Sequence, residues 1–304
     1  MKLTQLRCLL AIAETGSFSE AALQLGMSQS SVSGSLSALE AHLECTLIER
    51  GRFGARLTGI GQEVVVHARA VLSAAEGLEQ QVALYKGKVQ GQLVICTFRS
   101  MASQVIPPLM RHLRPLHPEL QLQLLESTTC EPISLLKPLE DGSADLAFIP
   151  DHDYLAFLSW VVMEDPYVAL LPEGWGAGEV FHPQHLLQHP LILSRCEHCA
   201  GRILQYLDGH GLVPKEVLQV QDDFTMYSMV AQQLGWCLNP RLAIDFVPPG
   251  TRMLPLALPL GRTIRLAVRS GGLRLPAVRH FMQALKTLLP DSALPETAPQ
   301  SQSS

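Results

Sequence analysis

The sequence predicts an α/β protein that carries a separate all-helical domain at its N-terminus. Residues 1–57 are rich in serine, leucine and small residues with helical periodicity, and one long helical pattern without proline runs from Thr58 to about Tyr85. From Gln92 to about Leu289, short strand-like runs alternate with helical stretches. Because such alternation is typical of βαβ units, we expect a mostly parallel sheet there. The 304-residue chain is 47% hydrophobic, which is enough for buried cores.

Composition narrows the class of protein. The net charge of −5 argues against a general polyanion binder. No apolar run approaches the roughly 18 residues of a membrane span, and no signal peptide is recognised, so we expect a cytoplasmic protein without a membrane partner. The cysteines number seven and are scattered, which favours a reduced protein over a disulfide scaffold.

The helical region has the spacing of a helix-turn-helix. Residues 17–20 (Ser-Phe-Ser-Glu) have the form of a capping box and predict a short helix from Ser19 to Leu25. Gly26 allows a sharp turn, and Ser28 can cap a second helix from about Gln29 to His42. This spacing alone is weak evidence, since an ordinary helical bundle explains it equally well.

The second helix has one apolar and one polar face. Its apolar residues recur with helical spacing and predict a buried stripe, formed by Val32, Leu36, Leu39 and Leu43. The opposite face is small and polar, so it can lie close to base edges in a major groove. The residues predicted here to contact DNA are Ser28, Gln29, Ser30, Ser31, Ser33, Gly34 and Ser37.

An arginine-rich turn follows these helices and resembles a wing. Arg50, Arg52 and Arg56 can reach phosphates or a minor groove. Residues 1–87 hold seven basic and eight acidic residues, which is unusual for a DNA-binding module. Three of the seven basic residues nevertheless gather in this turn, so the local charge favours DNA.

The long helix carries a heptad pattern. Two apolar rows have the spacing of a coiled-coil seam about three heptads long, and they consist of Val64, Val71, Leu78 and Tyr85 and of Ala68, Ala75 and Val82. A single amphipathic helix packed on its own domain is the alternative. We favour dimerisation, because it would fix the distance between paired recognition helices.

The N-terminal residues carry a family resemblance. Residues 21–33 (AALQLGMSQSSVS), together with Leu47-Ile48-Glu49-Arg50 and Leu57-Thr58, resemble the LysR-type transcriptional regulators, and the similarity continues to about residue 289. The N-terminal part departs from the family pattern in three places: Ser30 replaces a usual proline, Gly34 a long polar residue and Glu44 a common glycine. In the second part, Arg99 and Cys96 stand where small residues are usual.

The resemblance implies a domain layout and a set of partners. It implies a winged helix-turn-helix in residues 1–58, a linker and dimerisation helix in 59–87, and an effector-binding domain of two periplasmic-binding-protein-like α/β lobes in 91–289. Residues 290–304 are expected to be a disordered tail. A dimer or tetramer is expected to bind inverted-repeat DNA, to contact RNA polymerase and to respond to a small anionic effector in the cleft. No cofactor and no enzymatic activity are expected.

Three loops at strand ends are candidates for the effector site, because ligands of parallel α/β sheets bind beyond the carboxyl ends of the strands. Their hydroxyl groups suit an anion, and Arg99 could grip a carboxylate with two hydrogen bonds. Alternatively, these residues only cap helices. The predicted effector residues, two of them (Phe224 and Thr225) carried over from the resemblance, are Thr97, Phe98, Arg99, Ser100, Ser127, Thr128, Thr129, Arg195, Phe224 and Thr225.

The third of these loops follows the predicted strand at residues 191–193 and contains a CxxC motif, Cys196-Glu197-His198-Cys199. Its thiols could be inert, form a redox pair, or bind a soft metal with His198, although metal sites more commonly use a second CxxC. A thiol-disulfide oxidoreductase is a rival reading, but it would not need a winged domain, and no glycine-rich phosphate loop, GxSxG or HExxH motif is found. A purely architectural DNA-binding protein would leave residues 91–289 unexplained.

Overall fold

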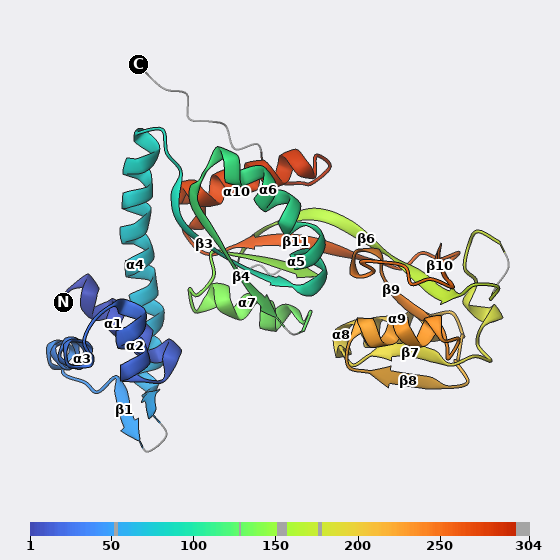
Figure 1. The fold of residues 1–304 in the computed structure, drawn as a ribbon, viewed down its shortest axis with the longest axis horizontal. Coiled ribbons are helices and arrows are strands. Elements are labelled where there is room, and N and C mark those ends of the chain that lie inside the picture. Colours follow the sequence, from blue (N-terminus) through green and yellow to red (C-terminus); the bar gives the residue numbers. More distant parts are fainter. Residues whose placement is uncertain (52–53, 128, 151–156, 176–177, 296–304) are drawn as a thin grey trace.

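The computed structural model describes residues 1–51, 54–127, 129–150, 157–175 and 178–295. Figure 1 shows a small helical domain at the N-terminus, one long helix beside it, and two α/β lobes. None of the helices in these ranges is long and apolar enough to cross a membrane.

The N-terminal domain is a helix-turn-helix followed by a β-hairpin. It contains α1 (Leu3–Thr15), α2 (Phe18–Leu25), α3 (Gln29–Leu43), β1 (Ile48–Gly51) and β2 (Gly54–Leu57). The two strands pair antiparallel and form the wing. The three helices share one apolar core with the start of the long helix, which confirms the winged helix-turn-helix.

Local capping groups define the helix ends in this domain. The Ser17 hydroxyl accepts a hydrogen bond from the Glu20 amide, and the Ser28 hydroxyl accepts one from the Ser31 amide. Helix α2 therefore starts one residue earlier than predicted. Gly26 adopts the left-handed conformation that ends α2, and Glu44 ends α3 with a φ of 53°. A left-handed residue at a helix C-terminus favours glycine, which this chain has at position 26 but not at position 44.

The long helix α4 (Gly59–Tyr85) connects the N-terminal domain to the first lobe. Val65, Ala68 and Leu72 are buried in the N-terminal core. The burial of Ala68 corrects the second row of the predicted seam, because this side chain packs within its own chain. Near the other end of α4, Gln80 is buried, and its side-chain oxygen accepts a hydrogen bond from the Ala277 amide at 3.4 Å.

Polar contacts attach the middle of α4 to both neighbouring domains. The Arg69 guanidinium lies 3.7 Å from the Glu14 carboxylate in α1 and 3.3 Å from the Asp141 carboxylate in the first lobe. One turn further along, Ser73 accepts a hydrogen bond from Arg269. Helix α4 is thus held by side chains along its length as well as by its ends.

The remainder of the chain forms two lobes, which the long strand β6 (Leu158–Pro172) connects (Figure 1). Lobe 1 contains β3 (Gln90–Phe98), α5 (Arg99–Gln104), α6 (Ile106–Leu116), β4 (Glu119–Ser127), α7 (Pro132–Glu140), β5 (Leu146–Pro150), β11 (Gly261–Val268), η3 (Gly272–Arg274) and α10 (Pro276–Leu288). Lobe 2 contains η1 (Pro183–His185), β7 (Leu191–Ser194), α8 (Glu197–Gly209), β8 (Val217–Val220), α9 (Asp223–Ala231), β9 (Cys237–Pro240), η2 (Arg241–Ala243) and β10 (Thr251–Pro255).

The large sheet is mixed, so the prediction of a mostly parallel sheet is wrong. Its strand order is β10-β6-β11-β5-β3-β4, and β9 pairs with β6. Strand β3 runs parallel to β4 and β5, whereas β11 runs antiparallel to β5 and β6, and β9 and β10 run antiparallel to β6. The physical reason is the path of the chain, because β6 leaves lobe 1 and β11 returns to it in the opposite direction. The small β7–β8 sheet is parallel.

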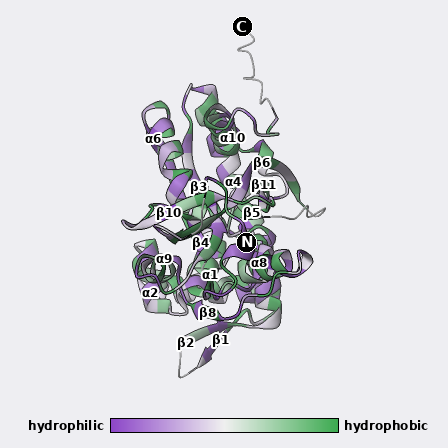
Figure 2. Cartoon of the chain, turned by 90° about the vertical axis from the view of Figure 1, so that its right-hand side faces the viewer, coloured by the Kyte–Doolittle hydropathy of each residue, from purple (hydrophilic) through white to green (hydrophobic). Residues whose placement is uncertain are grey.

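Each lobe has its own apolar core. Phe148 and Phe281 are fully buried in lobe 1, and Trp236 is fully buried in lobe 2. Figure 2 shows helices with both hydrophobic and hydrophilic segments, as expected for elements with one buried face. The predicted disorder from Pro290 onward is wrong for residues 290–295, because Leu294 is buried in the lobe 1 core. The rest of the tail lies outside the described residues.

Candidate functional site

Helix α3 presents its polar face to solvent and its apolar face to the core. Val32, Leu36 and Leu39 are buried, whereas Leu43 is 37% exposed, so the predicted stripe ends one turn early. Ser33 is half-buried. The other predicted contact residues are all exposed, namely Ser28, Gln29, Ser30, Ser31, Gly34 and Ser37.

Hydroxyl groups gather at the start of α3. The Ser28 hydroxyl lies 2.9 Å from the Ser30 hydroxyl and 2.7 Å from the Ser31 hydroxyl. A helix N-terminus carries partial positive charge and free amide donors, so this end of α3 favours a phosphate group. The hydroxyls can donate to the same group, which compensates in part for the absence of lysine and arginine on α3.

The wing places one arginine directly against the recognition helix. Arg50 donates a hydrogen bond of 2.8 Å to the Ser33 hydroxyl, and its guanidinium lies 4.4 Å from the centre of the Phe18 ring. Arg56 is exposed on β2. Arg52, the third predicted DNA contact of the wing, lies outside the described residues. Arg50 therefore adds positive charge beside the polar face of α3 and holds its Ser33 side chain.

Close backbone packing fixes the wing on the helices. A Cβ atom on Gly54 would lie 2.5 Å from the Gly16 carbonyl oxygen, and Gly54 has a φ of 110°. The Ala55 amide donates to that same oxygen at 2.8 Å. Glycine is required at position 54 on both grounds, and the wing keeps a defined orientation to α3.

A cavity of about 290 Å³ lies between the two lobes, near the lower end of the range for small-molecule sites, roughly 300–1,000 Å³. Of the ten predicted effector residues, six line it: Phe98, Arg99, Ser100, Ser127, Thr129 and Phe224. Thr97 is fully buried and is not among the described lining residues. Arg195 and Thr225 are exposed and are not among the described lining residues, and Thr128 lies outside the described residues. Thr225 instead donates to Asp222, which caps α9.

The predicted anion-binding arginine is already paired with carboxylates of the other lobe. The Arg99 guanidinium forms ion pairs with Asp223 and, at 3.2 Å, with Asp245, and donates to the Ala243 carbonyl at 3.0 Å. Burial disfavours its charge, but the charge and hydrogen bond of Asp223, together with Tyr227 and Asp245, more than offset burial, so the pKa of Arg99 is raised. Arg99 belongs to lobe 1 and its partners to lobe 2, so these ion pairs connect the lobes.

A second arginine, which sequence reasoning missed, also lines the cavity. Arg262 is buried and forms an ion pair of 2.8 Å with the buried Asp165. It also donates to the Ser100 hydroxyl at 2.9 Å, and its guanidinium lies 4.9 Å from the centre of the Phe98 ring. The available signal was an arginine next to the apolar run of β11, but its carboxylate partner is 97 residues away.

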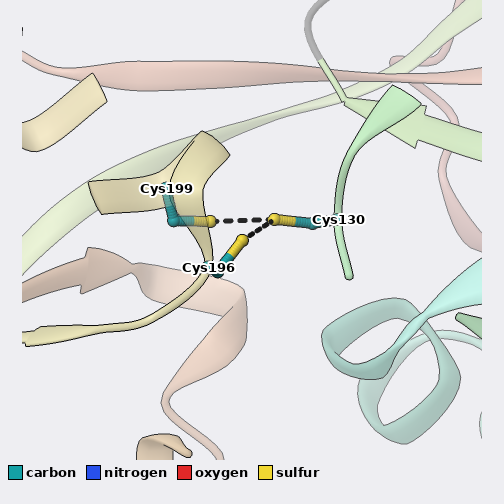
Figure 3. Close-up of side chains that lie close together, drawn as sticks. All are labelled: Cys130, Cys196 and Cys199. Carbon is teal, nitrogen blue, oxygen red and sulfur yellow. Dashed lines mark hydrogen bonds between the residues drawn. The ribbon is translucent and has the colours of Figure 1, made fainter. Parts of the chain in front are cut away.

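Three cysteines that line the cavity, one from lobe 1 and two from lobe 2, lie close together (Figure 3). Cys130 lies between β4 and α7 in lobe 1, whereas Cys196 caps α8 and Cys199 lies in its first turn in lobe 2. The Cys130 sulfur is 2.8 Å from that of Cys196 and 3.0 Å from that of Cys199. All three sulfurs lie within 4.8 Å of one another. Sequence reasoning had singled out the CxxC pair, with His198, but not its partner Cys130.

The thiols of this cluster differ in acidity. Hydrogen bonds from Cys130 and Cys199 lower the pKa of Cys196 far below its usual range. The hydrogen bond with Cys196 raises the pKa of Cys130, and burial adds to this. Hydrogen bonds with Cys130 and Cys196, together with burial, raise the pKa of Cys199. The cluster therefore favours one thiolate, on Cys196, at the start of α8, where the helix dipole also favours negative charge.

A winged helix-turn-helix joined to a two-lobed domain with a cavity between its lobes defines a DNA-binding transcription regulator with an effector domain. Residues 3–62 match the family model "Bacterial regulatory helix-turn-helix protein, lysR family", and residues 86–290 match "LysR substrate binding domain". The chain belongs to the LysR family of transcriptional regulators.

Individual relatives agree with this assignment. The chain is 35% identical over 292 residues to the probable HTH-type transcriptional regulator LrrA of Synechococcus elongatus, covering 96% of this chain and 98% of that protein. Its fold is similar to that of full-length OxyR C199D from Pseudomonas aeruginosa (TM-score 0.75, 23% identity, 99% of each chain). It is also similar to full-length CbnR complexed with its target DNA (TM-score 0.64, 19% identity, 94% of this chain and 99% of that one).

Proposed function

We propose that this regulator binds inverted-repeat DNA with α3 in the major groove and the wing on the phosphate backbone. The observation that carries the proposal is the exposed polar face of α3, flanked by the wing with Arg50 and Arg56. The small side chains of this face permit close approach to base edges, while the arginines supply the sequence-independent attraction. RNA polymerase is the further macromolecular partner proposed for a regulator of this class.

We infer that a second copy of the chain covers the exposed seam of α4. Val71, Leu78, Val82 and Tyr85 are 41%, 66%, 49% and 93% exposed in the single chain. These four side chains keep the heptad spacing, and a coiled-coil partner would bury them. A dimer formed in this way, or a tetramer built from two such dimers, would present paired recognition helices to the two halves of an inverted repeat.

We propose that a small anionic effector binds in the cavity between the lobes and competes for Arg99. Asp223 and Asp245 occupy the guanidinium in this structure. A carboxylate or phosphate ligand that takes over these hydrogen bonds would release a contact between the lobes, and this differential interaction would couple binding to the geometry of the domain.

Selection from a random duplex pool tests the DNA part of this proposal. Purified protein should enrich a motif with two inverted half-sites, and their separation should match whole turns of the double helix. Enrichment of no motif would overturn the proposal. For the effector, a thermal-shift screen with small carboxylates, phosphates and their neutral amide analogues should raise the melting temperature with the anions only. Stabilisation by a neutral analogue to the same extent would contradict an anionic effector.

A further inference from the structure

The three-cysteine cluster joins parts of the chain that are distant in sequence. Cys130 belongs to a lobe 1 loop, and Cys196 and Cys199 belong to the first turn of a lobe 2 helix, 66 and 69 residues further on. All three sulfurs point to one place at the cavity wall (Figure 3). A CxxC at a helix start places both of its thiols on one side, and here a third thiol faces them from the opposite lobe.

The spacing of the sulfurs suits a metal ion. Zn²⁺ binds thiolates at about 2.3 Å, so the sulfur ligands of one ion lie roughly 3.8–4.0 Å apart. The three sulfurs already lie within 4.8 Å of one another. Two of their separations, 2.8 and 3.0 Å, are shorter than the spacing around an ion, so the side chains would move apart by about 1 Å to admit one.

We propose that Cys130, Cys196 and Cys199 form a trithiolate site for one soft divalent metal ion, such as Zn²⁺ or Cd²⁺. Soft thiolate ligands select such ions over Mg²⁺ or Ca²⁺, which prefer oxygen. Tetrahedral coordination needs a fourth ligand, and because the cluster lines the cavity, a water molecule or a small ligand can supply it.

The number and placement of the thiols favour a metal over a disulfide. A disulfide would join only two sulfurs and leave the third beside it, whereas a metal ion uses all three. The ion would also connect Cys130 of lobe 1 to α8 of lobe 2, so it would hold the two walls of the cavity together. Because this site uses no residue of α3 or the wing, and neither Arg99 nor its carboxylate partners, the proposal does not depend on the DNA or anion proposals.

Titration of the fully reduced full-length protein with Cd²⁺ tests the proposal. The ultraviolet absorption of cadmium–thiolate bonds should rise and saturate at one ion per chain, and the melting temperature should rise with it. Cys130→Ser, Cys196→Ser and Cys199→Ser should each lower the affinity by roughly 100-fold or more, since even changes beside the ligands of a metal site cost 10–100-fold. Cys45→Ser is the matched control, because this half-buried thiol of the N-terminal domain should leave the affinity unchanged.

Each alternative gives a different result. Unchanged affinity in Cys130→Ser would overturn the three-thiol site and leave a CxxC chelate. The absence of saturable binding in the reduced parent, combined with a Cys196–Cys199 disulfide after peroxide treatment, would overturn the metal proposal in favour of the redox pair. The melting temperature of each metal-free variant shows whether it is folded, so that loss of binding is not confused with loss of structure.

Discussion

The DNA-facing surface and the cavity between the lobes use polar groups in opposite ways. The surface of α3 exposes uncharged hydroxyls, and the hydrogen bonds among Ser28, Ser30 and Ser31 are local to one helix turn. The cavity instead holds charged groups that are partly or fully buried and paired over long sequence distances, such as Arg262 with Asp165. Apart from the capping hydroxyl of Ser28, the polar side chains on the exposed face of α3 can therefore be replaced at little cost to folding, whereas those of the cavity contribute to both stability and lobe geometry.

The largest effect should follow from breaking the buried ion pair. Asp165→Ala leaves the Arg262 charge buried without its partner, and we expect a loss of about 3–5 kcal/mol in the free energy of unfolding. Urea denaturation measures it. Replacing both residues together, in the double variant Asp165→Leu/Arg262→Met, should recover much of the loss. Equal stability of the single variant and the parent would remove the contrast between the two regions.

A charge in the α4 seam should break the oligomer rather than the fold. Val71→Glu would place an unpaired charge in the apolar contact between two copies, at a cost of several kcal/mol to association. Light scattering should show a smaller mass, and DNA affinity should fall because the half-sites are no longer bound together. Gln81→Glu, which alters an exposed residue outside the seam, is the control. A parent-like mass for Val71→Glu would rule out the seam.

Loss of Arg99, which connects the two lobes, should affect the response to the effector more than the stability of the fold. Arg99 is only partly buried, so Arg99→Ala should lower stability by no more than about 1 kcal/mol. We expect the proposed stabilisation by anions in a thermal-shift measurement to disappear, while DNA affinity without effector stays within the parent's range. Arg241→Ala, at an exposed arginine near the cavity, serves as the control. An unchanged anion response in Arg99→Ala would contradict the role of Arg99.

The smallest effect is expected from a substitution in the wing. Arg56→Ala should weaken binding to all duplex sequences and lower the slope of log affinity against log salt by about one unit, as for one lost phosphate contact. Stability should not change, because Arg56 is exposed. Arg114→Ala, at an exposed arginine of lobe 1, should leave the slope unchanged. A change of sequence preference in Arg56→Ala would instead indicate a base contact.

The difference between the two regions also explains what could be predicted from sequence. Helix caps and apolar stripes depend on residues three or four apart, so Ser17, Ser28 and the buried face of α3 were predictable. Strand direction is not encoded locally. The antiparallel pairing of β11 with β5 and β6, which makes the sheet mixed, was therefore not predicted. Strand β8 is difficult to recognise from sequence, because only four residues with a half-exposed pattern form it.

The cavity shows the same limit at the level of single side chains. The loops that contain Arg99 and Cys196 could be predicted as candidate ligand-binding loops, because they follow the carboxyl ends of strands. The pairing of Arg99 with Asp223 and the meeting of Cys130 with Cys196 join residues 124 and 66 positions apart. Such contacts depend on how the two lobes face each other, and no single segment carries that information.

Helix α4 acts mechanically as a lever arm. Its 27 residues span about 40 Å at a rise of 1.5 Å per residue. Because Arg69, Ser73 and Gln80 fasten it to its neighbours, we expect the arm to turn with lobe 1 instead of bending. A tilt of roughly 5° at one end displaces the other by ~3.5 Å, close to the rise of one base pair, about 3.4 Å. In the proposed dimer, inserting one base pair between the half-sites of the operator should therefore change the affinity for DNA by an amount that depends on this angle.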